Sequence, residues 1–304
     1  MQHAQAARVV ELPVRRSRSA LDAAIVSLRP RQWSKNVLLF AGVVFAAKLG
    51  DWTRWWEAAA AFGAYCAASS AAYLFNDLRD VRHDRAHPVK RDRPIARCEL
   101  SMGGALGLAS ALAAVALGAS AALGLASLLF MLSFLGLQAA YSLVLKHLVL
   151  VDVLAIGGLF AIRAAAGAAA VDVRISPWLV LCTGMLALFL GLAKRRGELV
   201  LVGAERTPGR PVLEGYSLEV VDQLVAVAAA STLISYSLYT FNVPHSKAMM
   251  VTIPFAVFGV FRYLLLVHRH DLGEEPETVL VSDLPILVTA ALWAATAVAV
   301  LLVT

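Results

Sequence analysis

Long apolar stretches recur along the whole chain, and they limit the folds that it can adopt. An α-helix of about 20 residues crosses the ~30 Å hydrocarbon layer of a membrane. We predict nine transmembrane helices, over residues 36–50, 56–76, 103–122, 124–144, 148–170, 177–193, 222–241, 248–267 and 284–303. With 60% of its residues hydrophobic, the chain is predicted to be an all-α, polytopic membrane protein and not a soluble domain.

The distribution of Lys and Arg predicts how these helices are oriented. Cytoplasmic loops of membrane proteins are enriched in Lys and Arg. If the N-terminus is cytoplasmic, 22 of the 27 Lys and Arg lie on the cytoplasmic side. The net charge of +6 then reflects membrane topology, with some attraction to anionic lipid, and not nucleic-acid binding.

Composition divides the chain into two parts. Residues 1–34 are polar and Arg-rich and lack the apolar core and cleavage site of a signal peptide, and we predict that residues 1–27 form a basic cytoplasmic tail. Residues 28–304 form the predicted transmembrane catalytic domain. Cys66, Cys98 and Cys182 are too widely spaced to predict a disulfide framework or a Cys-x-x-Cys metal site.

The stretch "NDLRDVRHD", residues 76–84, places polar groups at the predicted cytoplasmic end of the second helix. On a continuous helix Asp77, Asp80 and Asp84 point within about 60° of one another, and Asn76 lies beside them. One interpretation is a solvated helix end whose acids pair with the arginines of the same stretch. The other is a site for Mg²⁺, because clustered carboxylates repel unless a cation lies among them.

A zinc site overlaps the same stretch as a competing interpretation. His83 and His87 are four residues apart with Asp84 between them, which imitates a zinc-binding helix. Pro88 is predicted to end that helix, and no third nitrogen ligand lies nearby. We therefore favour the metal–diphosphate site, with the histidines contacting phosphate or water.

"NDLRDVRHD" resembles the NDxxDxxxD motif that follows the second helix in the UbiA superfamily of intramembrane prenyltransferases. The resemblance covers about residues 25 to 300. "LRPRQWSKN" (28–36), "KRDRPIA" (90–96), "AYSLVLK" (140–146) and "KRRGEL" (194–199) are similar to one branch of that superfamily. This branch transfers phosphoribose from phosphoribosyl diphosphate to decaprenyl phosphate for arabinan synthesis in mycobacterial-type cell walls.

The loop predicted after the sixth helix departs from the superfamily pattern. Ordinary members have a second Asp-rich motif there that helps to hold magnesium on a prenyl diphosphate. This chain has Glu198 among Lys194, Arg195 and Arg196 instead. Phosphoribosyl diphosphate carries roughly −5, and a lipid phosphate about −2. Arg and Lys would supply the charge that magnesium leaves uncompensated.

The predicted site residues fall into three groups, taken from the motifs and the resemblance. The metal ligands, which also count as catalytic, are Asp77, Asp80 and Asp84; Tyr141 and Lys146 complete the catalytic set. The predicted substrate-binding residues are Lys35, Asn36, Asn76, Arg82, Lys90, Arg91, Arg93, Asp152, Lys194, Arg195, Arg196 and Glu198. Arg163, within the fifth predicted helix, is expected to extend to the outer rim and is left out.

The resemblance implies a Mg²⁺-dependent polyprenyl-phosphate phosphoribosyltransferase, with Mn²⁺ as an alternative metal. Attack of the lipid phosphate on the anomeric carbon predicts inversion. The resemblance also implies a plasma-membrane protein with its active site facing the cytoplasm, and a homo-oligomer for which we expect a trimer. The alternatives are a prenyltransferase acting on an aromatic acceptor, against which the basic loop argues, and a transporter, for which no internal repeat is evident.

Overall fold

The computed structural model describes residues 18–45, 50–86, 90–205, 211–242, 247–270, 279 and 282–303. Its helices are α1 (Ala20–Leu28), η1 (Pro30–Phe40), α2 (Ala41–Phe45), α3 (Trp52–Arg79), α4 (Val81–Ala86), η2 (Lys90–Asp92), α5 (Met102–Ala122), α6 (Leu125–Leu143), η3 (Leu145–His147), α7 (Val151–Ala170), α8 (Pro177–Glu205), η4 (Pro211–Gly215), α9 (Leu218–Asn242), η5 (Lys247–Thr252), α10 (Ile253–His270) and α12 (Leu284–Val303). No strand occurs within these ranges.

Eight of the described helices are long and apolar enough to cross a membrane, which confirms the predicted multi-pass all-α fold. They are α3, α5, α6, α7, α8, α9, the η5–α10 pair and α12. The helix predicted over 36–50 differs from the others. Its described part belongs to the 3₁₀ segment η1, which begins at Pro30, and to the five-residue α2. Residues 46–49 lie outside the described ranges.

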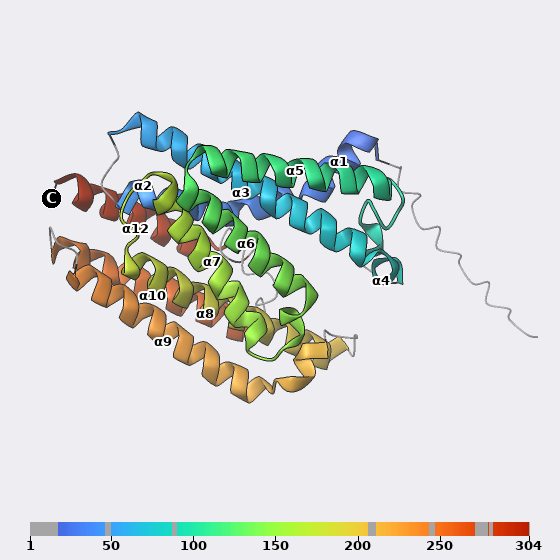
Figure 1. Cartoon of the computed structure of the whole chain (residues 1–304). Coiled ribbons are helices and arrows are strands. Elements are labelled where there is room, and N and C mark those ends of the chain that lie inside the picture. The colour runs from blue at the N-terminus through green and yellow to red at the C-terminus, as the bar shows by residue number, and fades with distance from the viewer. Residues whose placement is uncertain are drawn as a thin grey trace, which may run out of the picture.

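Burial identifies α3 and α7 as the centre of the bundle. In the most apolar window of each, 56% and 61% of the residues are buried, compared with 11% in α12. In Figure 1, α5 runs along α3 on one side of the bundle, and α6 and α7 lie between this pair and α9. Asp77 on α3 and Asp152 and Arg163 on α7 are accordingly buried in the protein interior.

The segment η1–α2 packs against α7 with backbone touching backbone. A Cβ atom added to Gly42 would lie 2.7 Å from the carbonyl oxygen of Gly167. One added to Gly167 would clash with the backbone of Leu39. Because Gly42 and Gly167 lack side chains, the backbone of η1–α2 can lie directly against the backbone of α7.

Replacing Gly167 with Ala is expected to destabilise the protein by about 1–3 kcal/mol, because the added methyl group meets backbone that cannot rotate away. Thermal unfolding of the detergent-solubilised protein measures the effect. Gly184→Ala is the matched control, since nothing lies within 4 Å of its added Cβ and alanine favours a helix by about 1 kcal/mol. Equal melting temperatures for the two variants would contradict the close packing of η1 on α7.

The "KRRGE" stretch, residues 194–198, lies within a helix, so the prediction of a loop there is wrong. Helix α8 continues through it to Glu205. The physical reason is that Ala, Lys, Arg, Glu and Leu all favour helix, and Gly197 alone does not end it. A helix fixes the directions of these charged side chains, and neighbouring residues consequently point to different partners.

Candidate active site

The carboxylates of Asp77 and Asp84 converge on one guanidinium group. Arg93 Nη1 donates to Asp77 Oδ1 (3.0 Å) and to Asp84 Oδ2 (2.7 Å). Helix α3 ends at Arg79 and α4 begins at Val81, yet the Asp84 N–H still donates to the Asp80 carbonyl, so helical spacing persists through the bend. Asp77 and Asp84 are each only 3% exposed. The predicted acidic face therefore contains a fixed, buried pair.

Arg29 belongs to this site, although it is not among the predicted site residues. Its Nη2 donates to the same oxygen, Asp77 Oδ1, at 2.6 Å. Its backbone adopts the left-handed conformation (φ 53°) between α1 and η1, and its guanidinium lies 4.7 Å from the centre of the Tyr73 ring. Its place in the motif "LRPRQWSKN" was the available signal.

Asp80 lies apart from this pair and faces the end of α6. Its Oδ2 is 3.9 Å from Lys146 Nζ, and the neighbouring Arg79 donates to the Ser142 carbonyl (3.1 Å). Tyr141, on the last turn of α6, lies near enough to Arg195 to interact with its charge. These contacts bring the predicted catalytic residues Lys146 and Tyr141 to the same end of the bundle as the acidic pair.

A second pair of carboxylates surrounds Arg195 in the interior. Arg195 Nε lies 2.7 Å from Asp152 Oδ2, and its Nη1 pairs with Glu198. Asp152 is 0% exposed and Arg195 is 1% exposed. Both guanidinium contacts are with acids of this chain, so Arg195 is fixed between α7 and α8 and has little contact with solvent.

Tyr216, which is not among the predicted site residues, completes this cluster. Its hydroxyl donates to Asp152 Oδ1 (2.7 Å) and accepts from the Leu150 N–H (2.7 Å). Burial and the hydrogen bond to Asp152 raise the pKa of Tyr216 to about 12. The hydroxyl therefore stays protonated at neutral pH and remains a donor to Asp152.

Arg196 points to the other side of α8. Its Nε donates to Asp222 Oδ1 (2.7 Å) on α9, and its Nη1 donates to the Val267 carbonyl (3.1 Å) on α10. Lys194 is partly exposed. The helix thus separates Arg195 from Arg196, and the structure does not bring the "KRRGE" side chains together in one patch.

Arg163 is buried in the bundle, so its predicted position at the outer rim is wrong. Its Nε donates to Asn36 Oδ1 (2.8 Å), its Nη1 donates to the Leu159 carbonyl (3.2 Å), and its guanidinium lies 4.7 Å from the Phe134 ring centre. Asn36 is itself 0% exposed and donates to Cys66 Sγ (3.4 Å). Asn36 consequently connects η1 to α7 and lies away from the acidic pair.

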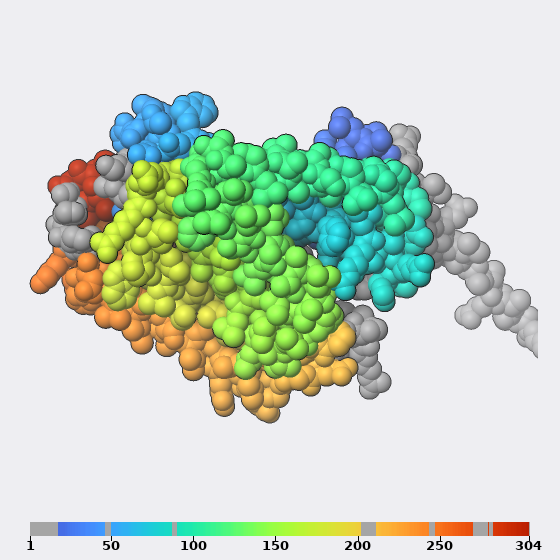
Figure 2. Space-filling model, in the orientation of Figure 1, coloured from blue at the N-terminus to red at the C-terminus, as the bar shows by residue number. Residues whose placement is uncertain are grey.

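The other predicted substrate-binding residues lie on four elements: Lys35 on η1, Asn76 on α3, Arg82 on α4, and Lys90 and Arg91 on η2. Arg82, Lys90 and Arg91 are exposed, and Lys35 and Asn76 are partly exposed. In Figure 2 the surface is notched between the cyan α3–α4 region and the light-green end of α6. Basic side chains of α4 and η2 thus lie at the surface, close in sequence to the buried acids. His87, from the alternative zinc pair, lies outside the described residues.

The acidic pair fits a hard cation that keeps part of its water shell. No group of three or more His, Cys, Asp or Glu side chains that could hold a metal ion is found within the described part of the chain. Two carboxylate oxygens nevertheless meet at one nitrogen of Arg93, a position that a divalent cation could equally occupy. Mg²⁺ is commonly bound through one or two carboxylates plus substrate phosphates, and this arrangement provides two.

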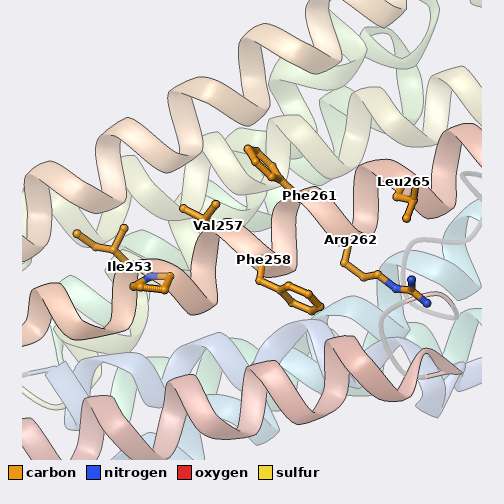
Figure 3. Close-up of a pocket in the computed structure, with 7 residues that line it drawn as sticks. Ile253, Val257, Phe258, Phe261, Arg262 and Leu265 are labelled. Atoms are coloured by element: carbon orange, nitrogen blue, oxygen red, sulfur yellow. The ribbon is translucent and has the colours of Figure 1, made fainter.

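An apolar cavity of about 420 Å³ extends through the half of the bundle away from the acids. It is lined by η1–α2, α8, α9, α10 and α12, including Phe45, Trp178, Tyr239 and Trp293. A separate open groove of about 670 Å³ follows α10, with Arg262 the one charged residue of its lining (Figure 3). The cavity has the volume and apolar lining typical of a lipid or cofactor site.

Comparisons with known proteins agree with this architecture. The chain matches the UbiA prenyltransferase family over residues 37–282. It is 32% identical over 282 residues to decaprenyl-phosphate phosphoribosyltransferase of Corynebacterium glutamicum, covering 90% of this chain and 84% of that protein. It is 33% identical over 283 residues to the enzyme of that name from Mycobacterium tuberculosis, covering 90% and 92%.

Solved structures show the same fold at lower sequence identity. A UbiA homolog from Archaeoglobus fulgidus, bound to GPP and Mg²⁺, superposes with a TM-score of 0.70 at 19% identity. The superposition covers 92% of this chain and 99% of that one. A digeranylgeranylglyceryl phosphate synthase gives a TM-score of 0.70 at 12% identity, covering 94% and 99%.

Proposed function

The chain belongs to the UbiA prenyltransferase family, and we propose that it transfers 5-phosphoribose from phosphoribosyl diphosphate to a polyprenyl phosphate, releasing diphosphate. Relatives at 32% and 33% identity that bear the name decaprenyl-phosphate phosphoribosyltransferase support this proposal. Decaprenyl phosphate is the acceptor that their name suggests, and cell-wall arabinan synthesis is the corresponding use of the product.

The observation that carries the proposal is the balance of charge at one end of the bundle. One carboxylate pair, Asp77 and Asp84, lies beside partly exposed basic residues. The second pair, Asp152 and Glu198, already forms ion pairs with the buried Arg195. One cation at the first pair would leave most of the roughly −7 on donor and acceptor phosphates uncompensated. Arginine and lysine side chains at this end, including Arg29, Arg93 and Lys146, would compensate the remainder.

In the proposed reaction, a phosphate oxygen of the lipid forms a bond to the ribose anomeric carbon. The bond from that carbon to the diphosphate breaks, and its electron pair leaves with the diphosphate. Bound Mg²⁺ would stabilise the charge that develops on the leaving group. Asp77 and Asp84 would hold the ion, and Arg29 and Arg93 would orient the phosphates. A lipid phosphate is already an anion at neutral pH, so no strong general base is needed, and attack opposite the leaving group inverts the configuration.

We place the protein in the plasma membrane with the acidic pair on the cytoplasmic side, where a soluble sugar diphosphate has access. The Lys and Arg distribution supports a cytoplasmic N-terminus. The apolar cavity would hold part of the polyprenyl chain. Helix α8 supports this placement, because it supplies Cys182 and Leu186 to the cavity lining and also carries Arg195. A homotrimer is the oligomer that we propose from the family resemblance.

A paired assay tests the function. Purified protein in detergent with Mg²⁺ receives either phosphoribosyl diphosphate with a polyprenyl phosphate, or a prenyl diphosphate with an aromatic acid. We expect diphosphate release and a phosphoribosylated lipid only from the first pair, and no release after chelation of the metal. Release from the second pair alone would establish the aromatic prenyltransferase alternative. Retained configuration in the lipid product would contradict direct displacement.

A further inference from the structure

We propose that Arg29 and Arg93 occupy the place of the metal in the ligand-free protein, so that the divalent cation enters together with the donor's diphosphate and not before it. The inference rests on the proposed function for the identity of the donor. It goes further in assigning to two arginines an exchange of partners, from carboxylates to phosphates, that accompanies binding.

The geometry of the acidic pair supports this exchange. Arg93 Nη1 is within 3.0 Å of one oxygen from each carboxylate, and Arg29 Nη2 is 2.6 Å from the Asp77 oxygen of that pair. A cation bound by these same two oxygens would take the position that Arg93 Nη1 holds. Metal and guanidinium therefore compete for the same two oxygens.

The charge balance predicts whether the carboxylates bind the Arg93 guanidinium or Mg²⁺, without and with the bound donor. Two carboxylates and two guanidinium groups make the ligand-free cluster neutral, so a free Mg²⁺ ion gains little attraction there and must displace Arg93. A Mg²⁺–phosphoribosyl diphosphate complex carries roughly −3. Its phosphates offer the displaced arginines bidentate partners, and such pairs are among the strongest hydrogen-bonded contacts in proteins.

The exposure of the four side chains predicts which of them move when the donor binds. The side chains of Asp77 and Asp84 are 3% and 5% exposed, so the surrounding structure holds them in place. The side chains of Arg29 and Arg93 are 28% and 25% exposed, which leaves them access to a ligand arriving from solvent. By contrast, Arg195 is 1% exposed between Asp152 and Glu198, so that guanidinium cannot exchange in the same way.

Binding of Mn²⁺ to the full-length protein in detergent, measured by electron paramagnetic resonance, tests the proposal without any reaction. We expect weak binding of Mn²⁺ alone to the wild type and at least about tenfold tighter binding when inorganic diphosphate is added. In Arg93→Gln, binding of Mn²⁺ alone should become about tenfold tighter, because the competing charge is gone. The gain from diphosphate should shrink at the same time, since a phosphate contact is also lost.

Arg97→Gln is the matched control. Arg97 is on the same segment but pairs with Asp92 and Glu99, so its loss should leave Mn²⁺ binding unchanged. Arg29→Gln provides a second test if Arg93→Gln does not fold, and it should tighten Mn²⁺ binding in the same direction. Equal or weaker Mn²⁺ binding in the folded arginine variants would overturn the proposal. The assay contains neither phosphoribosyl diphosphate nor a lipid acceptor. Its result is therefore independent of whether the protein transfers phosphoribose.

Discussion

Replacing Asp84 with Asn is expected to lower phosphoribosyl transfer by about a thousandfold or more while the protein still folds. Asn keeps the shape of Asp but removes the charge with which a cation would be held beside the leaving diphosphate. Loss of one group that stabilises charge in a transition state commonly lowers the rate by about 10²–10³. A metal ion held by only two carboxylates depends heavily on each of them, so we expect a loss of about a thousandfold. The contact between Arg93 and Asp77 does not involve Asp84, so it is expected to persist in this variant.

Steady-state transfer rates and the elution profile of the purified variant measure the two parts of this prediction. Asp92→Asn is the control, because Asp92 is an exposed acid of the neighbouring η2 and has no contact with Asp77 or Asp84 among those observed. Its transfer rate should equal that of the wild type. A well-folded Asp84→Asn variant with wild-type turnover would exclude Asp84 from the metal site.

Local sequence patterns were sufficient to predict that Asp77 and Asp84 lie on one helical face, although Asp80, predicted with them, faces Lys146 instead. Asp77 and Asp84 are seven residues apart, which is two helical turns, and helical hydrogen bonding continues through the bend at Asp80. The apolar stretches likewise predicted the eight spanning helices of the described residues, because crossing hydrocarbon imposes a minimum length on each, although a ninth, predicted over 36–50, is not among them. Both predictions depend on residues that are close in the sequence.

Contacts between distant residues could not be predicted in this way. Arg29 is 48 residues from Asp77, and Tyr216 is 64 residues from Asp152. Arg163 was expected at the rim because a charge in a spanning helix usually reaches for water. Its partner Asn36 lies 127 residues away, and it approaches only because glycines let η1–α2 pack directly on α7. A sequence pattern contains no information on that approach.

Replacing Arg195 with Met is expected to destabilise the protein by about 3–5 kcal/mol, since it leaves Asp152 fully buried without its cation. The remaining donor to Asp152 among its observed contacts is the Tyr216 hydroxyl. Thermal unfolding in detergent measures the loss. Arg196→Met is the matched control on the same turn of α8. Its partner Asp222 is 37% exposed and can be solvated when the arginine is removed, so a smaller loss is expected.

Adding Asp152→Asn to Arg195→Met separates the structural role of Arg195 from its predicted role in binding substrate. The amide introduced by Asp152→Asn can still accept a hydrogen bond from Tyr216 but carries no buried charge, so the double variant should recover most of the lost stability. Transfer should stay at least about tenfold below wild type if the charge of Arg195, close to Tyr141, also acts on the substrate phosphates. Full activity in a stable double variant would instead give Arg195 a purely structural role. The counter-charge for the substrates would then have to come from Arg29, Arg93 and Lys146, around the one carboxylate pair that can exchange its cation.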